Sequence, residues 1–246
     1  ALLGPAACAA SPVPLHTLAL PLLDAAAAIA GELWFSASPC RQGEYEGIRY
    51  ACDGHVLYGA VQMDEDAFTN SEDAAYPLSR ATEAAYRRIF ALLDREGYAH
   101  PWRTWNYLAG INEETGGLER YRQFNIGRHQ AFGTRAQLNR ATMPAACALG
   151  LAGGPLSIAF LAGRTPPTAV ENPRQVAAYD YPADYGPRSP AFARAAVAQL
   201  PGQELLFVSG TASILGHATV HRGDMAAQMR ESLANIAAVV AEAARH

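Results

Sequence analysis

The same order of elements occurs twice along the chain, with strand-like segments leading into a long helix, and this order restricts the fold more than any other feature. In the first half, residues 47–52 and 55–63 read as strands joined by Asp53-Gly54, a dipeptide typical of a tight β-hairpin. The apolar spacing then changes to that of a helix over residues 71–96. Two further strands are predicted in this half, over residues 32–35 and 102–108.

The second half repeats this order more loosely. Its predicted elements are strands over residues 145–151 and 156–162, a loop rich in Pro and Tyr over 179–190, a short helix over 192–199, a strand over 204–209 and a long helix over 224–245. Strands that precede a long helix in each half favour two related α+β units. We therefore expect an arm or loop over residues 1–17, a first unit over 18–118, and a second unit over 119–246 that stops at least one strand short of the first.

Composition excludes several classes of protein. With 246 residues, 50% of them hydrophobic, the chain can bury a sizeable core. All 19 basic residues are Arg, which excludes a Schiff-base lysine, a pyridoxal-phosphate enzyme and a Walker-type phosphate loop. The four cysteines form no C-x-x-C pair, so neither a zinc cage nor a redox dithiol is indicated, and the apolar stretch over residues 18–31 is too short to span a bilayer. We expect a soluble, cytoplasmic protein.

A cationic region lies within this acidic protein, whose net charge is -4. Residues 120–170 contain no Asp or Glu but six arginines: Arg120, Arg122, Arg128, Arg135, Arg140 and Arg164. The densest part, residues 119–128, alternates Arg with Tyr, Phe, Asn and Gly, and we expect it to be a loop that binds a planar small molecule with carboxylate groups. The alternatives are a solvated basic face or arginines paired with distant acids. A nucleic-acid partner is not expected, since the pI is about 6.0 and no recognition motif is present.

Three segments carry longer motifs. Residues 103–112 read RTWNYLAGIN, residues 119–128 read ERYRQFNIGR, and residues 209–217 read SGTASILGH. Together they resemble the chorismatases, bacterial chorismate-cleaving enzymes of macrolide starter-unit and xanthomonadin pathways. The resemblance implies two tandem RidA/YjgF-like domains, each with helices packed on one face of a mixed sheet. It also implies cleavage of the enolpyruvyl ether of chorismate, without metal or organic cofactor, to pyruvate and either a trans-dihydroxycyclohexadiene carboxylate or a hydroxybenzoate such as 3-hydroxybenzoate.

The resemblance also implies roles for particular residues. Tyr121 and Arg128 match the substrate-binding pair of the family, and the wall beside the substrate ring is formed by Gly210, Thr211, Ala212 and Ser213. Side-chain chemistry adds Arg122, Tyr179 and Arg188 as further substrate-binding candidates, with a structural role as the alternative for each. The catalytic acid of the family is a Glu in a segment that we expect beyond His246, so the catalytic residue is unknown.

Other functions stay open from the sequence. Glu119 lies beside the arginines and is a further candidate for the catalytic acid, with an ion pair to Arg122 or Arg103 as its alternative role. A possible metal site is suggested by His217, His221 and Asp224. The glycines around them favour an ordered loop instead, so we expect no metal. The competing functions are a non-catalytic RidA-like module that binds small carboxylates and a RidA-type imine deaminase. The expected partner is chorismate alone, with no membrane or nucleic acid, and the chain is a monomer or a trimer.

Overall fold

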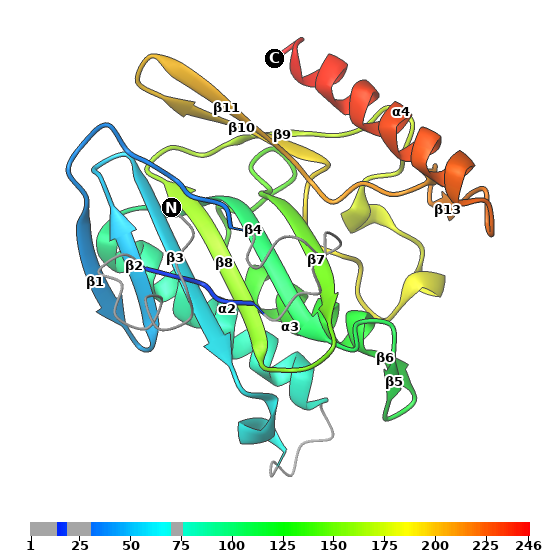
Figure 1. Ribbon diagram of the computed structural model, residues 1–246, viewed down its shortest axis with the longest axis horizontal. Helices are drawn as coiled ribbons and strands as arrows, with labels where there is room; N and C mark the ends of the chain where they lie inside the picture. Colours follow the sequence, from blue (N-terminus) through cyan, green and yellow to red (C-terminus); the bar gives the residue numbers. More distant parts are fainter. Residues whose placement is uncertain (1–13, 19–30, 70–75) are drawn as a thin grey trace.

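The computed structural model describes residues 14–18, 31–69 and 76–246, and it has a mixed α+β fold (Figure 1). A six-stranded sheet has the order β1-β2-β3-β8-β4-β7. Its elements along the chain are β1 (Arg41–Tyr45), β2 (Ile48–Cys52), β3 (Val56–Met63), the 3-10 helix η1 (Glu65–Phe68), α2 (Pro77–Glu96), β4 (His100–Ala109), the hairpin strands β5 (Glu114–Thr115) and β6 (Leu118–Glu119), α3 (Arg120–Phe132), β7 (Ala145–Leu151) and β8 (Leu156–Gly163).

The second part of the fold is a smaller sheet with a helix. Its three strands have the order β11-β10-β9, and α4 crosses next to them in Figure 1. The elements are β9 (Thr168–Val170), η2 (Ala178–Asp180), η3 (Ala183–Tyr185), β10 (Ala195–Leu200), β11 (Gln203–Val208), the short strands β12 (Ile214–Leu215) and β13 (Ala218–Thr219), and α4 (Met225–Ala243). The Asp224 carboxylate caps α4 by accepting a hydrogen bond from the Ala227 amide at 2.9 Å.

The hairpin predicted at Asp53-Gly54 is confirmed. Asp53 Oδ1 accepts hydrogen bonds from the backbone amides of His55 at 2.9 Å and Val56 at 2.8 Å, and Gly54 has a φ of 94°, which favours glycine. All neighbouring strands of the large sheet are antiparallel except β4 and β7, which are parallel. The sheet is therefore mixed, as expected.

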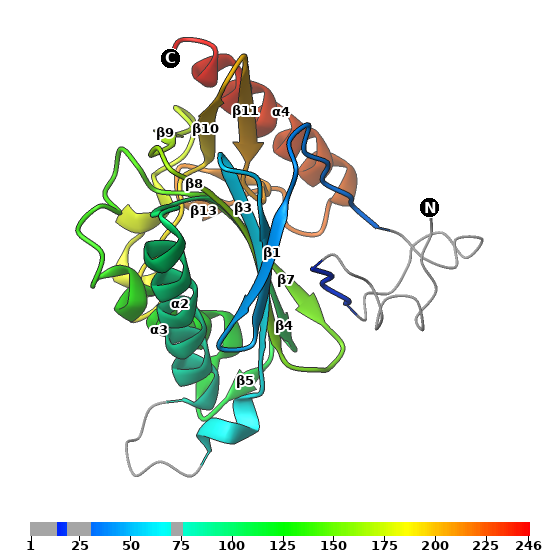
Figure 2. The ribbon, with the colours of Figure 1, turned by 90° about the vertical axis from the view of Figure 1, so that its left-hand side faces the viewer.

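Helices α2 and α3 both cover one face of the large sheet, which Figure 2 shows edge-on. The two helices approach closely at Gly127, where an added Cβ would lie 1.9 Å from the backbone oxygen of Ser79. The apolar positions of α2 face this layer and form most of the core with the sheet; they include Leu78, Ala81, Ala85, Ile89, Leu92 and Leu93. The predicted helix over 71–96 is thus confirmed from Pro77 onward, and residues 71–75 lie outside the described part of the chain.

The opposite face of the sheet meets the second part of the fold. Trp102 of β4, Ala145 of β7 and Leu161 of β8 pack against Ala196 and Ala198 of β10, together with Phe207 of β11. Small side chains on β10 allow the two sheets to come close. A single apolar cluster therefore fixes the position of β10 and β11 on the large sheet.

Three sequence predictions are wrong. Residues 192–199 form no helix, because most of them belong to strand β10, whose alanines are buried between layers. The arginine-rich segment is helix α3 and not a loop, because its polar residues Gln123, Asn125 and Arg128 are buried in place of an apolar stripe. Residues 32–35 form no strand, and β1, which the sequence did not indicate, pairs with β2 instead.

The other predicted strands and the last helix are present. Strands predicted over residues 47–52, 102–108, 145–151, 156–162 and 204–209 correspond to β2, β4, β7, β8 and β11, and the final helix corresponds to α4. The expected division between residues 118 and 119 lies between strands of one sheet, since β7 and β8 pair with β4 and β3. Most of the predicted arm over residues 1–17 lies outside the described residues.

Candidate active site

Most arginines of the acid-free stretch find carboxylates or carbonyls elsewhere in the fold. The closest N–O distance is 2.6 Å from Arg120 to Glu65, 3.2 Å from Arg122 to Glu119, 2.5 Å from Arg135 to Asp94 and 2.5 Å from Arg140 to Asp180. Arg164 donates to the backbone oxygens of Gly54 and Gly97. The alternative of arginines paired with distant acids is therefore correct for three of the six, Arg120, Arg135 and Arg140, whereas Arg122 pairs with Glu119 three residues away. Glu119 is held in an ion pair, as its alternative role required.

Arg128 differs from the others because it is buried and has no ion-pair partner in the described part of the chain. Its residue exposure is 1%, and its guanidinium lies 5.0 Å from the centre of the Phe124 ring. Nη2 donates to Asn125 Oδ1 at 2.9 Å, and Nε has no hydrogen-bond partner among the described atoms. A buried charge without an anion is costly to a fold, which is the usual sign of a group kept for binding.

Arg194, which sequence reasoning missed, is the second such group. Its exposure is 7%, and its Nη2 donates to the Val176 carbonyl and to the Tyr181 hydroxyl, both at 2.8 Å. Its Nε also lacks a partner within the described residues. The guanidinium carbons of Arg128 and Arg194 lie 5.6 Å and 5.5 Å from the centre of one ring, that of Phe192. The structure thus brings two buried cations to one flat apolar surface.

A carboxyl group lies next to this pair. Burial raises the pKa of Glu171 to about 7, and the nearby charge of Arg194 and the Tyr179 hydroxyl oppose the shift only in part. The same proximity acts on Tyr179, where burial and the charge of Glu171 raise the pKa to about 12. Both carboxyl oxygens of Glu171 are buried. Such a group holds a proton at neutral pH and can donate it.

The other predicted residues of this region lie on α3 or on the loop that covers it. Tyr121 stacks on Phe124 at a ring distance of 6.4 Å. The side chain of Arg122 lies against Gly186 of the Pro/Tyr loop, since a Cβ on that glycine would be 3.3 Å from Arg122 Cγ. Arg188 is exposed, and its charge contributes, after burial, to lowering the pKa of His129 on α3. The structure therefore brings α3 and the loop over residues 179–190 together.

The predicted wall of Gly210, Thr211, Ala212 and Ser213 lies at the edge of β7. The Gly210 amide donates to the Ala146 carbonyl at 3.0 Å, and Asn235 of α4 donates to the Ala212 carbonyl at 3.1 Å. The hydroxyls of Thr211 and Ser213 donate to backbone oxygens of their own loop. The wall reaches the arginine pair through the backbone, because the Ser209 amide donates to the Arg194 carbonyl at 3.0 Å. Among the described residues, the loop over residues 210–213 forms no hydrogen bond with a side chain of α3.

The histidines of the possible metal site take part in loop contacts. His217 Nδ1 is 3.0 Å from the Tyr185 hydroxyl, and His221 Nε2 is 3.4 Å from Glu231. Within the described ranges, no group of three or more His, Cys, Asp or Glu side chains is placed to hold a metal ion. A hollow of about 600 Å³ elsewhere is lined by Asp64, Glu65 and Asp66, whose charge would repel a carboxylate ligand.

Comparison with known proteins gives the family. The model of the family "Chorismatase FkbO/Hyg5-like, N-terminal" matches residues 32–162. A chorismatase of Streptomyces rapamycinicus is 40% identical over 213 residues, which cover 85% of this chain and 61% of that protein. A 3-hydroxybenzoate synthase of Streptomyces hygroscopicus is 40% identical over 217 residues, with 85% and 60% covered. A crystal structure of a chorismatase matches with a TM-score of 0.75 at 40% identity and covers 85% of this chain and 61% of that one.

These matches include more than half of the chain, and their identity is well above that of unrelated proteins. The chain belongs to the FkbO/Hyg5-like chorismatase family. It spans about three fifths of the length of the curated relatives that it matches. None of the helices in the described ranges is long and apolar enough to cross a membrane.

Proposed function

We propose that the protein cleaves the enolpyruvyl ether of chorismate and releases pyruvate. The observation that carries this proposal is the pair of buried guanidinium groups, Arg128 and Arg194, on the ring of Phe192. Chorismate has two carboxylates and a flat cyclohexadiene ring, so it requires two cationic anchors beside an apolar surface. Family membership and the names of the relatives, chorismatase and 3-hydroxybenzoate synthase, support the same substrate.

The reaction requires a proton donor and a nucleophile that reacts with the resulting cation. Protonation of the enolpyruvyl methylene carbon converts the ether into an oxocarbenium ion. Water adds to this ion to give a hemiketal, which releases pyruvate and leaves the ether oxygen on the ring as a hydroxyl. Alternatively, the neighbouring hydroxyl loses its proton and attacks the ring carbon that carries the ether, so that pyruvate leaves with the ether oxygen. The resulting epoxide then opens with loss of a ring proton and protonation of its oxygen to give a hydroxybenzoate. A carboxylic acid with a raised pKa is suited to the first step. Among the described residues, Glu171 is a carboxyl group whose pKa, raised to about 7, matches this role.

The substrate-binding residues of this proposal are those of α3, the covering loop and the β7 edge. Arg128 and Tyr121 hold the substrate, Arg194 joins them, and Arg122, Tyr179 and Arg188 lie around them. The loop over residues 210–213 forms the wall beside the ring. Hydrolysis gives the trans-dihydroxycyclohexadiene carboxylate, and attack by the substrate's own hydroxyl gives a hydroxybenzoate.

The tandem RidA-like arrangement also stays a proposal. Three antiparallel strands followed by a long helix occur as β1-β2-β3-α2 and again as β9-β10-β11-α4, which supports two related units. On the basis of this recurrence, the proposed division between the two units lies after β8. The free thiols of Cys40, Cys52 and Cys147 suit a reducing compartment such as the cytoplasm.

A pyruvate-release assay tests the proposed function. Pure protein is mixed with chorismate, and pyruvate is followed by its reduction with lactate dehydrogenase and NADH. Arg128→Ala should lose most of the rate, whereas Arg87→Ala, on the exposed side of α2, serves as the matched control. Chorismate binding without pyruvate would favour the non-catalytic module. Ammonia release from an imine substrate, without chorismate turnover, would favour the deaminase.

A further inference from the structure

A third arginine is buried without an ion pair in the described part of the chain, and it lies on the other face of the large sheet. On β4, Asn106 points toward the helices, where it accepts from the Tyr86 hydroxyl at 2.6 Å. Arg103, Trp105 and Tyr107 alternate with it and point away from α2 and α3. Arg103 has an exposure of 8%. Because the sheet separates them, this group is distinct from the arginine pair that includes Arg128.

Arg103 has few partners for a buried cation. Its Nη1 donates to the Val208 carbonyl at 3.0 Å, and its guanidinium carbon lies 5.3 Å from the centre of the Trp105 ring. Burial lowers its pKa, against the opposing effects of neighbouring groups that include Cys147. Within the described residues Arg103 forms no ion pair with a carboxylate, and its side chain also interacts with the Cys147 thiol. An arginine without a carboxylate partner in a dry position binds a carboxylate tightly.

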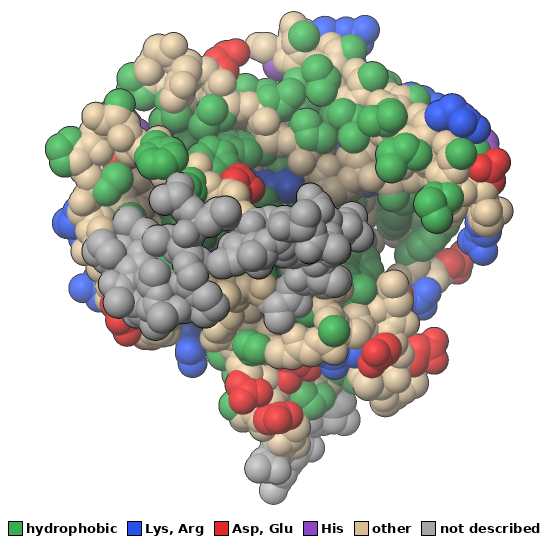
Figure 3. All heavy atoms as spheres, in the orientation of Figure 1, with side chains coloured by type: hydrophobic (Ala, Val, Ile, Leu, Met, Phe, Trp, Pro, Cys, Tyr) green, Lys and Arg blue, Asp and Glu red, His purple; other side chains and the backbone are tan. Residues whose placement is uncertain are grey.

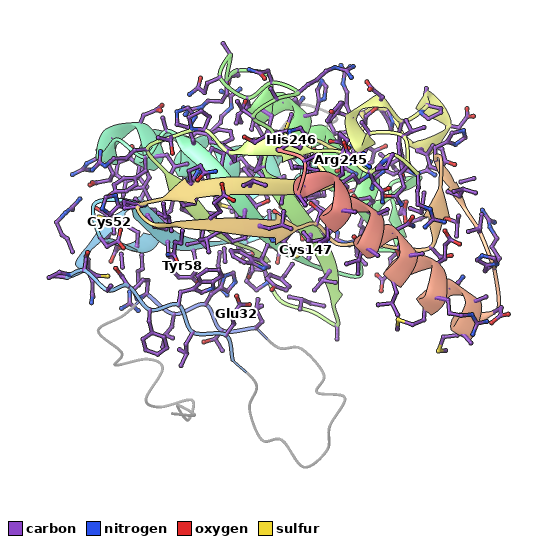
Figure 4. All side chains as sticks on the ribbon, turned by 90° about the horizontal axis from the view of Figure 1, so that it is seen from above. Glu32, Cys52, Tyr58, Cys147, Arg245 and His246 are labelled. Atoms are coloured by element: carbon purple, nitrogen blue, oxygen red, sulfur yellow. The ribbon has the colours of Figure 1, made fainter. Side chains whose placement is uncertain are left out.

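The Cys147 thiol and Tyr107 lie near Arg103, and Tyr58 lies across β8 from it, because both Tyr58 and Arg103 pair with Leu161. Cys147 lies opposite Trp105 in the β4–β7 pairing, and burial raises the pKa of its thiol. Burial is also the main reason that the pKa of Tyr58 rises to about 12, and burial raises the pKa of Tyr107. Neither tyrosine hydroxyl has a hydrogen-bond partner in the ranges that the structure describes. Figure 4 shows Tyr58 and Cys147 on the same side of the sheet as Glu32.

Residues 14–18 contact part of this group. His16 meets Tyr107 edge-on at a ring distance of 5.9 Å, and the Thr17 carbonyl accepts from Gln62 of β3 at 3.4 Å. Both ring nitrogens of His16 are buried and have no partner among the described atoms. Burial lowers the pKa of His16 to about 4, so the ring is neutral and can donate one hydrogen bond.

Glu32 lies near this group and forms no ion pair with it among the described residues. Glu32 is exposed, and its charge contributes to the raised pKa values of Tyr58 and Cys147. Figure 4 shows Glu32 on the same side as these residues, and Figure 3, which views this face, shows acidic and basic side-chain atoms together in a hollow. A negative charge at the entrance repels a second carboxylate on a ligand.

We propose that Arg103, Tyr58, Tyr107 and His16 form a second binding site, specific for a small monocarboxylate. Arg103 binds the carboxylate, the tyrosine and histidine donors bind a further oxygen, and Trp105 supplies a flat apolar side. Glu32 disfavours dicarboxylates such as chorismate itself. A 2-oxo acid and an aromatic acid share this chemistry, and both are products of the proposed reaction. The site is argued from its own geometry and does not depend on that function.

The test is a titration of the whole chain with matched ligands. Benzoate and pyruvate are compared with benzamide, which has the shape of benzoate without its charge, by calorimetry and by saturation-transfer NMR. We expect benzoate to bind at least roughly tenfold more tightly than benzamide, because only the carboxylate pairs with a guanidinium. Weaker binding of pyruvate than of benzoate identifies the aromatic acid as the ligand, and the reverse identifies the 2-oxo acid. Equal binding of benzoate and benzamide would overturn the site.

Single substitutions test where benzoate binds. Arg103→Ala should abolish benzoate binding, and Tyr107→Phe, which keeps the ring, should weaken it by roughly fivefold. Arg87→Ala should leave it unchanged, since that residue is exposed on the helix side of the sheet. If Arg103→Ala does not fold, Arg103→Lys and Tyr107→Phe still test whether these two residues bind benzoate. Full affinity in both Arg103→Lys and Tyr107→Phe contradicts the proposal, whatever the outcome of the chorismate assay.

Discussion

The guanidinium carbons of Arg128 and Arg194 lie 5.6 Å and 5.5 Å from the centre of the same ring, that of Phe192. The two charges come from different parts of the chain, one from α3 and one from the segment that leads into β10. In a poorly solvated position two like charges repel each other, and a dianionic ligand between them removes that repulsion. The shared ring therefore indicates a ligand-binding site more directly than the arginine-rich composition of the surrounding sequence does.

Replacing Arg128 tests this pair directly. Arg128→Ala should cost about 2–4 kcal/mol of transition-state binding, because a charge-assisted pair in a dry site is lost. The corresponding decrease in kcat/KM for chorismate is roughly 30- to 1000-fold. Arg128→Lys should recover only part of this, since an ammonium group lacks the planar fork. A rate within about threefold of the parent in Arg128→Ala, with its fold intact by circular dichroism, would remove Arg128 from the site.

Glu171 should make stability depend on pH. Its pKa is raised from 4.5 to about 7 in the folded protein, so the folded state holds the proton more tightly than the unfolded state. The resulting stabilisation is complete below about pH 4.5 and is lost as the pH rises through about 7. Allowing for partial exposure, it amounts to roughly 1–2 kcal/mol. Glu171→Gln cannot ionise, so its Tm should fall less than that of the parent between about pH 5 and about pH 8.

The control for this experiment is Glu83→Gln, which removes an exposed carboxylate that pairs with Arg87 on α2. Its Tm should follow the parent over the same pH range. The same Glu171→Gln protein also reports on catalysis. If its chorismate turnover is unchanged, Glu171 is not the proton donor.

Ala212 should influence which product is formed. If the loop over residues 210–213 lies beside the substrate ring as proposed, the Ala212 methyl group narrows the space there and favours trapping of the cation by water, so the parent should release mainly the trans-dihydroxycyclohexadiene carboxylate. Because the Ala212 carbonyl is held by Asn235, Ala212→Gly removes the methyl without releasing the loop. Chromatography of the products should show a severalfold shift toward hydroxybenzoate, with Ala218→Gly unchanged. Hydroxybenzoate as the main product of the parent would contradict the role of the methyl group.

Gly127 should be essential for the packing of α2 on α3. An added methyl group would lie 1.9 Å from the Ser79 carbonyl, so the helices would have to separate. Gly127→Ala should therefore destabilise the fold by about 3 kcal/mol, or roughly 6–12 °C in Tm. Gly153→Ala is the matched control, because nothing lies within 4 Å of its added Cβ. Equal Tm values for the two variants would show that the helices are less closely packed than described.

The elements predicted best from the sequence are those whose burial follows a simple period. The β2–β3 hairpin has alternating side chains with Asp53-Gly54 between them, and α2 has an apolar stripe, so local chemistry and tertiary packing agree. Helix α3 has no such stripe, since Gln123 and Asn125 take the buried positions. Strand β10 reads as a helix because Ala has high helix propensity, but between two layers the small side chain decides the outcome.

The site was only partly predictable for a related reason. Arg128 lies within a motif that marks it, whereas Arg194 is surrounded by alanines and prolines that carry no signal of function. Arg103 lies within a quoted motif, yet its burial depends on pairing among β4, β7 and β8, which are distant in sequence. The strand period does place Arg103, Trp105 and Tyr107 on one face, and this was the available signal.

The position of β8 also has a consequence for synthesis of the protein on the ribosome. Residues 156–163 pair with residues 56–63 on one side and with β4 on the other, so the central strand of the sheet is also the last to be made. At roughly 5–20 residues per second, β3 and β4 wait several seconds with an unpaired edge each. During this interval the nascent chain exposes two strand edges that pair readily with other chains. Cells that produce this protein must protect those edges until β8 emerges.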